Sequence, residues 1–296
     1  MKREDRIWQW VAHTVLFLFS LACILPFVLL IVSSFTDERS IVRNGYSFFP
    51  EEFSLNAYEY IWQQSSLILN SYGITIFITI FGTAGSLLIT SLLAYPLSRR
   101  DLPGRMVISF LLFFTMLFNG GMVPTYLIYT QMLGMKNTLA ALIIPGLLMN
   151  GFMVLLMRTF FMTTIPAPVL ESASIDGANE LTIYRKIVLP LSLPILATVG
   201  LMQGLMYWND WYNGLMFITE PKLFSLQNVL NRLMSDIQFL ANNSQMSSVV
   251  GGAAAQLPSE TFRMAIAVIS VVPIMMAYPF FQKYFVKGMT IGSVKG

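Results

Sequence analysis

Residues 168–194 read PVLESASIDGANELTIYRKIVLPLSLP, a polar stretch between two of the most apolar segments of the chain. Pro166 and Pro168 are typical of a helix start, because proline fixes φ and its missing N–H costs nothing there. Asp176 and Gly177 form a turn pair, in which glycine accepts the left-handed backbone conformation. Apolar side chains then recur every three to four residues, as on one face of a helix: Ala178, Leu181, Tyr184, Ile187 and Val188. The stretch therefore predicts two short helices joined by a tight turn.

The chain as a whole is too apolar for a soluble globular protein. Of its 296 residues, 55% are hydrophobic and only 11% are charged, whereas soluble domains have about 25% charged residues. The single cysteine, Cys23, has no partner for an internal disulfide, and the single histidine, His13, has no companions for a metal site. The net charge of +3 is small and no basic run occurs, so no nucleic-acid partner is expected. The composition predicts an all-α polytopic membrane protein.

Six apolar stretches are long enough to cross a bilayer, which takes about 20 residues. They cover residues 11–32, 68–97, 108–129, 139–157, 191–208 and 264–285. The first is too long for the apolar region of a signal peptide, so we expect it to be retained. Small and hydroxyl residues at helical spacing in the second stretch, from Gly82 to Thr90, mark a face for close helix packing. We therefore predict a single transmembrane domain over residues 1–296, with six helices.

The basic residues predict the orientation of this domain. With six spans, both termini share one side with the loops around 98–107 and 158–190. Twelve of the eighteen bases fall on that side: Lys2, Arg3, Arg6, Arg99, Arg100, Arg105, Arg158, Arg185, Lys186, Lys283, Lys287 and Lys295. Because lysine and arginine concentrate in cytoplasmic loops, both termini are predicted to be cytoplasmic. The long loops over 34–66 and 209–262 would then lie outside.

The absence of several motifs narrows the function. The sequence has no Walker A loop, no H-E-x-x-H and no G-x-S-x-G. A membrane enzyme such as a glycosyl-lipid transferase would need clustered acids or a metal site, and neither is present. No predicted span carries a charge at mid-depth, which disfavours a proton-coupled transporter, although sodium sites built from carbonyls stay possible. The chain is expected not to be an enzyme, and the alternative of a transporter or channel that does not use ATP stays open.

The polar stretch itself has two interpretations on these grounds. A rigid helix–turn–helix with one apolar side suits insertion into a cleft on a cytoplasmic partner. An amphipathic helix resting on the membrane surface would have the same pattern. The residues alone leave both open.

The sequence ESASIDGANELTIYRKIVLP resembles the Glu-Ala-Ala loop of ABC importer permeases, which is patterned E-A-A-x-x-D-G-A and ends in I-x-L-P. Ser172 replaces the usual alanine, a small-for-small change. The rest of the chain resembles the carbohydrate branch, in the manner of the maltose permease subunit, through WNDW at 208–211 and FVKGMTIGSVKG at 285–296. The loop positions that match are Glu171, Ala173, Asp176, Gly177, Ala178, Ile187, Leu189 and Pro190.

This resemblance implies a permease subunit of an ATP-driven sugar importer in a bacterial cell membrane. The matching loop positions, with Leu181, would seat in a groove of a cytoplasmic ATPase. ATP and Mg²⁺ would bind to that ATPase, and this chain would hold no cofactor and no metal. The implied partners are a second homologous permease, forming a heterodimer, two ATPase subunits, an extracytoplasmic solute-binding protein, the sugar and membrane lipid. The tail (Gly288, Gly292 and Lys295) would reach the ATPase interface, and the loop at 240–260 would enter the sugar cleft of the binding protein.

A sugar pathway needs aromatic faces and a few polar groups. Trp208, Asn209, Asp210 and Trp211 gather such groups at the end of the fifth stretch, and Asn119 lies beside a Gly-Gly pair in the third. Tryptophan and tyrosine are also enriched at membrane interfaces as anchors, and Asn-Gly bends also serve helix packing. Both interpretations stay open for these residues.

Overall fold

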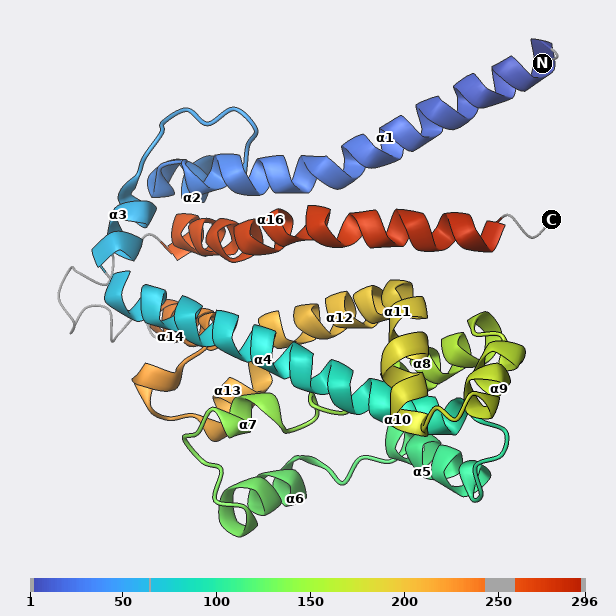
Figure 1. Cartoon of the computed structure of the whole chain (residues 1–296). Coiled ribbons are helices and arrows are strands. Elements are labelled where there is room, and N and C mark those ends of the chain that lie inside the picture. The colour runs from blue at the N-terminus through green and yellow to red at the C-terminus, as the bar shows by residue number, and fades with distance from the viewer. Residues whose placement is uncertain (1–2, 64, 243–258, 294–296) are drawn as a thin grey trace. The chain divides into compact units, whose positions relative to one another are not determined.

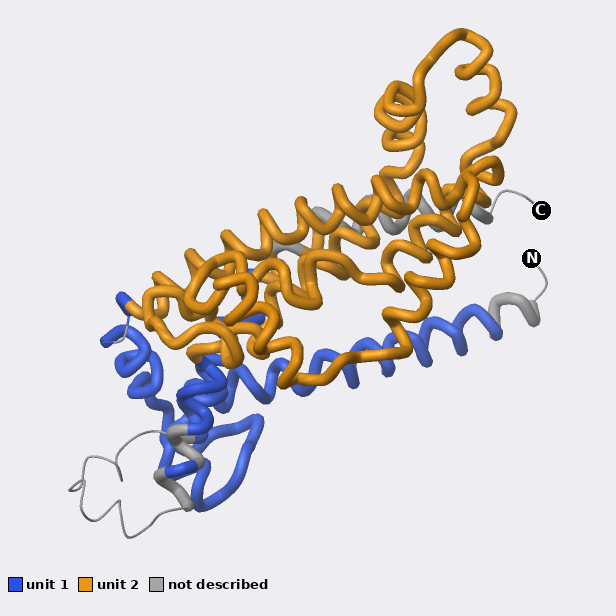
Figure 2. Tube along the Cα trace, turned by 90° about the horizontal axis from the view of Figure 1, so that it is seen from below, with its two compact units in different colours: residues 1–66, 230–273 blue, residues 67–229, 274–296 orange. Residues whose placement is uncertain are grey.

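The computed structural model describes residues 3–63, 65–242 and 259–293. Within these ranges the chain is helical and has no strand; an isolated antiparallel bridge joins Thr36 to Phe53. The all-α prediction is confirmed for this part of the chain. The chain divides into two compact units, one of residues 1–66 and 230–273 and one of residues 67–229 and 274–296 (Figure 2).

The first unit contains three helices from the start of the chain and parts of two later ones (Figure 1). They are α1 (Arg3–Ser34), α2 (Glu38–Asn44), α3 (Asn56–Gln63), the later part of α14 (Leu226–Asn242) and the start of α16 (Ser259–Ser293). The carboxylate of Glu38 accepts hydrogen bonds from the backbone N–H groups of Glu260 and Thr261 at 3.0 and 2.9 Å. Tyr46 donates to Glu260 at 2.7 Å. Burial and this bond raise the pKa of Tyr46 to about 12. These contacts fix the start of α16 to the segment after α1.

The second unit is built around α4 (Ser65–Ser98). Its other elements, in chain order, are α5 (Arg105–Leu117), α6 (Met122–Leu127), η1 (Ile128–Met132), α7 (Ala140–Ile143), α8 (Gly151–Thr164), α9 (Ala167–Ile175), α10 (Glu180–Ile183), η2 (Tyr184–Val188), α11 (Leu189–Leu191), α12 (Leu193–Trp208), α13 (Tyr212–Phe217) and η3 (Pro221–Leu223). A buried apolar core at the C-terminal end of α4 joins it to α5, α8, α10, η2 and α12. Figure 1 shows these labelled helices near one end of α4. The core supports the segment 168–194.

Two described helices are long and apolar enough to cross a membrane alone, residues 8–34 of α1 and α4. Three bent pairs raise the number to five if each pair is one span: α5 with α6–η1 at 111°, α8 with α9 at 79°, and α10–α11 with α12 at 80°. The sixth predicted stretch, 264–285, lies within α16, a helix of 35 residues. The structure thus contains apolar helices suited to a membrane, and the count of six spans stays a prediction.

The third predicted stretch is not the uninterrupted helix that we expected from 108 to 129. Helix α5 ends at Leu117 because Phe118 is extended and Gly121 has a φ of 89°, which only glycine adopts readily. The Asn119 side chain accepts a 2.9 Å hydrogen bond from the Gly121 N–H and stabilises the bend.

The fourth predicted stretch, 139–157, is also broken. Helix α7 ends at Ile143, and Gly146 has a φ of 70°. Helix α8 starts afresh at Asn150, whose side chain accepts hydrogen bonds from Phe152 N–H and Met153 N–H at 3.0 and 3.3 Å. Asparagine at this position satisfies the free N–H groups at the start of a helix. The apolar composition of 139–157 concealed these turn and cap residues.

The predicted outer loop at 209–262 contains more helix than its composition indicated. Helix α14 has 17 residues and buries Leu226 and Val229. The Leu226 N–H donates to the Thr75 hydroxyl of α4 at 2.8 Å. The apolar residues of 226–240 recur at helical spacing, so the sequence itself contained a signal for this helix.

Close packing of α4 on α12 confirms the prediction from the small residues of the second stretch. A Cβ on Gly82 would lie 2.5 Å from the Tyr207 ring, and one on Gly200 would lie 3.2 Å from Leu87. Helix interfaces in membranes use small residues in this way, because backbones can then approach closely.

Candidate functional site

The segment 166–190, named the coupling loop after the role that we propose for it below, is a helix–turn–helix as predicted. Helix α9 ends in a turn in which the Ala178 N–H donates to the Ala173 carbonyl at 3.0 Å and the Gly177 N–H donates to the Ser174 carbonyl at 3.1 Å. These two bonds form a Schellman motif, which requires a left-handed residue, and Gly177 has a φ of 82°. Asp176 and Gly177 therefore form the tight turn that their sequence predicted.

The second half of the coupling loop begins with a helix cap. The Asn179 side chain accepts a 2.8 Å hydrogen bond from the Thr182 N–H. Glu180 lies in the first turn of α10, where a negative charge is favourable. The chain then continues through η2 and α11 to Pro190, so the two helices are joined by a short, hydrogen-bonded turn.

The coupling loop has a buried side and an exposed tip. Ile183, Tyr184 and Val188 are buried in the core of the second unit, and Leu170, Ala173, Ala178, Ile187 and Leu189 pack against that core. At the tip, Ile175 is 86% exposed and Leu181 is 59% exposed. Leu181 is therefore not on the buried face that its spacing predicted; Ile183 takes that place. An exposed apolar pair beside a rigid turn is a surface suited to a partner protein.

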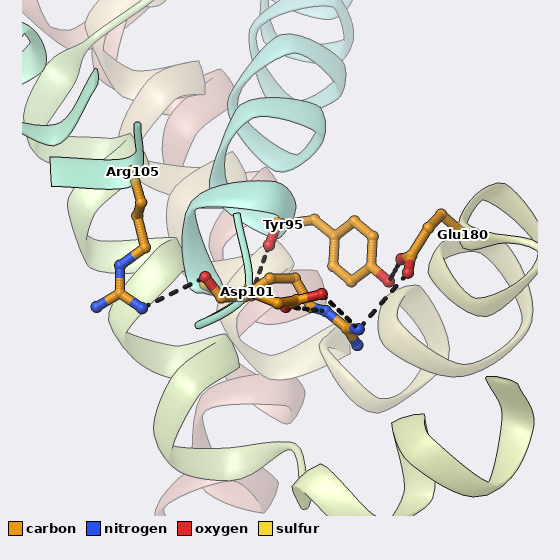
Figure 3. Close-up of polar contacts among 6 residues, drawn as sticks. Tyr95, Asp101, Arg105 and Glu180 are labelled. Atoms are coloured by element: carbon orange, nitrogen blue, oxygen red, sulfur yellow. Dashed lines mark hydrogen bonds and ion pairs between the residues drawn. The ribbon is translucent and has the colours of Figure 1, made fainter. Parts of the chain in front are cut away.

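A polar seam attaches the coupling loop to the end of α4. The hydroxyls of Ser91 and Tyr184 are 2.7 Å apart and buried. One turn further along α4, the Tyr95 hydroxyl donates to a carboxylate oxygen of Glu180, and the Arg99 guanidinium lies 3.6 Å from the other oxygen. Figure 3 shows the Tyr95 ring directed at the Glu180 carboxylate. The loop is thus joined by three polar contacts to Ser91 and Tyr95 of α4 and to Arg99, the residue directly after α4.

Arginines also stabilise the C-terminal end of α4. Arg158 of α8 donates to the Leu97 carbonyl at 3.0 Å. Arg105 of α5, labelled in Figure 3, donates to the Arg99 carbonyl at 3.3 Å. Positively charged side chains stabilise this end of a helix, where the last carbonyls lack intrahelical partners. Arg99 also pairs with Asp101 at 3.2 Å, and this hydrogen bond lowers the pKa of Asp101 below its ordinary value. The loop 98–104 is held by these contacts.

A second set of polar contacts holds the broken fourth stretch. Three side chains of 203–213 donate to its backbone carbonyls: Gln203 to Leu147, Tyr207 to Ile143 at 2.9 Å, and Asn213 to Pro145 at 3.0 Å. All three side chains are buried. A carbonyl freed from a helix in an apolar environment costs several kcal/mol unless it finds a donor. These side chains therefore permit a non-helical segment next to α12.

The comparisons with known proteins identify the family. Residues 86–291 match the model of the family described as "binding-protein-dependent transport system inner membrane component". This chain belongs to that family. It is 38% identical to the polygalacturonan/rhamnogalacturonan transport system permease protein YtcP of Bacillus subtilis over 99% of this chain and 100% of the relative. It is 40% identical to protein LplC of the same organism over 92% of this chain and 90% of the relative.

A solved structure supports the same assignment. The permease matches, with a TM-score of 0.77 and 32% identity over 96% of this chain and 99% of the other, a chain from a bacterial ABC transporter involved in the import of the acidic polysaccharide alginate. The protein is therefore an ABC importer permease, as the Glu-Ala-Ala resemblance predicted. The family is one of membrane subunits, in agreement with the apolar helices.

The predicted pathway residues of the permease lie in different surroundings. Trp208 is buried, with its ring 6.4 Å from that of Tyr72. Asn209 is exposed, and Trp211 is 45% exposed with its ring edge-on to Tyr212. Asn119 is exposed at the bend between α5 and α6. Trp211, Asn209 and Asn119 are thus accessible on this chain, whereas Trp208 is a packing residue of α12.

Asp210 lies two residues after the end of α12, and its Oδ2 atom is buried. Its carboxylate accepts a 3.2 Å hydrogen bond from the Asn213 N–H. Burial raises the pKa of the Asp210 carboxyl above its ordinary value, and hydrogen bonds from the Asn213 and Tyr212 backbones offset part of that effect. The described residues contain no group of three His, Cys, Asp or Glu side chains that could hold a metal.

The two remaining predicted regions of the permease are only partly described. Gly288 and Gly292 lie in the last turns of α16, and Lys295 lies outside the described residues. The loop at 240–260 was predicted to enter the sugar cleft of the binding protein. Most of it, from 243 to 258, also lies outside the described residues.

Several residues of the site were missed by sequence reasoning. Ser91, Tyr95 and Arg99 hold the coupling loop, and Gln203 holds the broken stretch. The four-residue spacing of 91, 95 and 99 was a usable signal, as was a glutamine within an apolar helix. The partners of these residues are 56 to 93 positions away, so the sequence did not pair them.

Proposed function

We propose that this permease forms half of the membrane pathway of an ATP-driven importer for oligosaccharides or polysaccharide fragments. It works in a bacterial cell membrane, with six spans and both termini in the cytoplasm. A second homologous permease completes the pathway as a heterodimer. Two cytoplasmic ATPase subunits bind ATP and Mg²⁺, and an extracytoplasmic binding protein delivers the sugar.

The carbohydrate assignment is supported by the relatives. The name of YtcP specifies polygalacturonan and rhamnogalacturonan, and the related solved transporter imports alginate. A further relative, 29% identical over the full lengths of both chains, is an arabinooligosaccharide permease, AraQ of Halalkalibacterium halodurans. All three names specify polymers or oligomers of sugars. Growth of a strain lacking this gene on such fragments, compared with growth on the monosaccharides, tests the assignment: a defect limited to the fragments supports it, and equal growth on both contradicts it.

The observation that carries the coupling role is the exposed tip of the coupling loop. Ile175 and Leu181 project from a turn that the Schellman motif makes rigid. In this proposal the tip seats in a groove of the ATPase, and Glu171, which is exposed on α9, contacts the rim of that groove. Closure of the ATPase dimer on ATP then moves the loop and switches the permease between inward- and outward-facing states.

The outer parts have complementary roles. Trp208, Asn209, Asp210, Trp211 and Asn119 contribute to the sugar pathway, Trp208 by supporting its exposed neighbours. The loop at 240–260 enters the sugar cleft of the binding protein, and the tail with Gly288, Gly292 and Lys295 reaches the ATPase interface.

Substitutions at the tip test the coupling role. Gly177→Ala forces an L residue into a left-handed conformation, at a cost of about 1–2 kcal/mol, although the space around it is open. Gly134→Ala is the matched control, because Gly134 also has a positive φ, 61°, and open space. We expect Gly177→Ala, Gly177→Asp and Glu171→Lys to reduce sugar uptake strongly while membrane levels stay normal, and Gly134→Ala to leave uptake intact. Normal uptake by the Gly177 and Glu171 variants would contradict the coupling role of this loop.

A further inference from the structure

The polar seam between the coupling loop and α4 has a definite register. The contacting residues are Ser91 and Tyr95, four positions apart on one face of α4, and Arg99, which directly follows the end of α4 at Ser98. Along the loop they are Tyr184 and Glu180, in the opposite chain direction. The inner contact, Ser91 to Tyr184, is buried, and the rings of Tyr95 and Tyr184 lie 5.5 Å apart. The seam therefore joins two antiparallel segments at successive turns.

Glu180 is the residue of the seam nearest the tip. Its two carboxylate oxygens have different partners, the Tyr95 hydroxyl on α4 and the guanidinium of Arg99 directly after α4. It starts α10 directly after the turn at 176–179, so a displacement of the turn reaches Glu180 before it reaches the buried core. Helix α4 has 34 residues and is about 50 Å long. A force on its last two turns consequently acts at one end of a long rigid element.

We propose that Glu180 is a positioning residue that fastens the coupling loop to the end of α4, so that the loop and α4 move together during transport. This inference rests on the proposed coupling role of the loop. When the tip is displaced, the Glu180 contacts carry the displacement into α4 through Tyr95 and Arg99. Without them the loop is still held by Tyr184 and the apolar core, but its tip shifts without moving α4 to the same extent.

The exposure of the Glu180–Arg99 ion pair distinguishes a positioning role of Glu180 from a role in the stability of the fold. The Glu180 side chain is 61% exposed and the Arg99 side chain 22%. An ion pair exposed to this degree contributes little to folding, because water screens it. Loss of the Glu180 charge is therefore expected to leave the permease folded and its seam partly intact, so that a change in transport reports on positioning.

The experiment uses the whole transporter, with binding protein, both permeases and ATPase, reconstituted in liposomes. Sugar uptake and ATP hydrolysis are measured together for Glu180→Gln, Glu180→Ala and Tyr95→Phe. Asp101→Asn is the matched control, because Asp101 also pairs with Arg99 but, among the described residues, forms no ion pair with the coupling loop. We expect the amount of sugar imported per ATP to fall about fivefold for the Glu180 variants. A fivefold change corresponds to the loss of a contact worth about 1 kcal/mol. Asp101→Asn should stay within about twofold of the wild type.

A charge exchange provides the rescue test. Arg99→Glu alone should lower the sugar imported per ATP as Glu180→Gln does, whereas Arg99→Glu combined with Glu180→Arg restores the bridge and should recover most of the loss. Recovery supports the proposal. Equal defects in the single and exchanged variants, an equal defect in Asp101→Asn, or unchanged import per ATP in Glu180→Ala would each overturn it. Failure of the proposed function gives a different result, since the wild-type complex would then hydrolyse no ATP in response to loaded binding protein.

Discussion

The hydroxyl of Tyr207 donates a 2.9 Å hydrogen bond to the backbone carbonyl of Ile143, 64 residues earlier in the chain. Ile143 is the last residue of α7, at the point where the fourth apolar stretch leaves the helical conformation. The bond supplies a donor that the helix no longer provides. Together with Gln203 and Asn213, Tyr207 makes the broken segment compatible with an apolar environment.

Removing this hydroxyl should lower stability. Tyr207→Phe keeps the ring and leaves the partly buried Ile143 carbonyl without its donor, at a cost of about 1–3 kcal/mol. We expect the midpoint of thermal unfolding in detergent to fall by several degrees. Tyr212→Phe, on an exposed tyrosine, is the control and should change it little. Equal midpoints for the Tyr207 variant and the wild type would show that the bond is dispensable.

The close approach of α4 to α12 predicts a sharp difference between two glycines of α4. A Cβ on Gly82 would lie 2.5 Å from the Tyr207 ring, whereas a Cβ on Gly73 would meet nothing within 4 Å. Gly82→Ala should therefore destabilise the permease by about 1–3 kcal/mol through overpacking. Gly73→Ala should be neutral or stabilising by up to about 1 kcal/mol, because alanine is the better helix former. Thermal unfolding of both variants is the measurement, and a stable Gly82 variant would contradict the packing.

The buried carboxyl of Asp210 predicts a dependence of stability on pH. Because burial raises its pKa in the folded protein, the charged form opposes folding. This penalty is absent below the pKa of the unfolded chain and fully present above the raised folded pKa. Asp210→Asn retains an acceptor for the Asn213 N–H and removes the charge.

We expect Asp210→Asn to unfold at a higher temperature than the wild type at pH 8, with the difference disappearing near pH 3. Thermal unfolding of both proteins across this pH range is the test. A variant less stable than the wild type at pH 8 would show that the carboxylate makes a favourable contact that outweighs its burial.

Asn137 is a further residue with a defined structural role. It has a φ of 57°, which asparagine tolerates better than most residues. Its side-chain oxygen accepts hydrogen bonds from the backbone N–H groups of Thr219 and Glu220, at 2.6 and 3.3 Å. Asn137→Ala loses these bonds and introduces backbone strain, whereas Asn137→Gly loses only the bonds. Both variants should be less stable, Asn137→Ala by about 1 kcal/mol more than Asn137→Gly. Hydrogen exchange at 217–220 checks this, and equal protection in the wild type and both variants would contradict it.

The sequence by itself determined the class of the protein and its recognisable local motif. An apolar composition, six long apolar stretches and the Asp-Gly pair with its flanking residues depend only on neighbours in the chain. The turn at Gly177 formed as predicted because its left-handed conformation and its hydrogen bonds lie within six residues. Missed local signals account for other differences: the cap at Asn150, the bend at Asn119 and the spacing of α14 were present but obscured by apolar surroundings.

Only the tertiary structure decided which polar groups meet. The contacts of Glu180 with Tyr95 and Arg99, and of Tyr207 with Ile143, join segments 64 to 85 residues apart. In an apolar environment each buried donor or acceptor needs a hydrogen-bond partner. The periodicity of the sequence predicts that a side chain is buried, but it does not predict which distant residue that side chain contacts. The exposure of Leu181 was likewise decided by packing, because Ile183 and not Leu181 fills the core formed with α4, α8 and α12. Packing between distant segments therefore determined how the coupling loop is held, and the local sequence determined its shape.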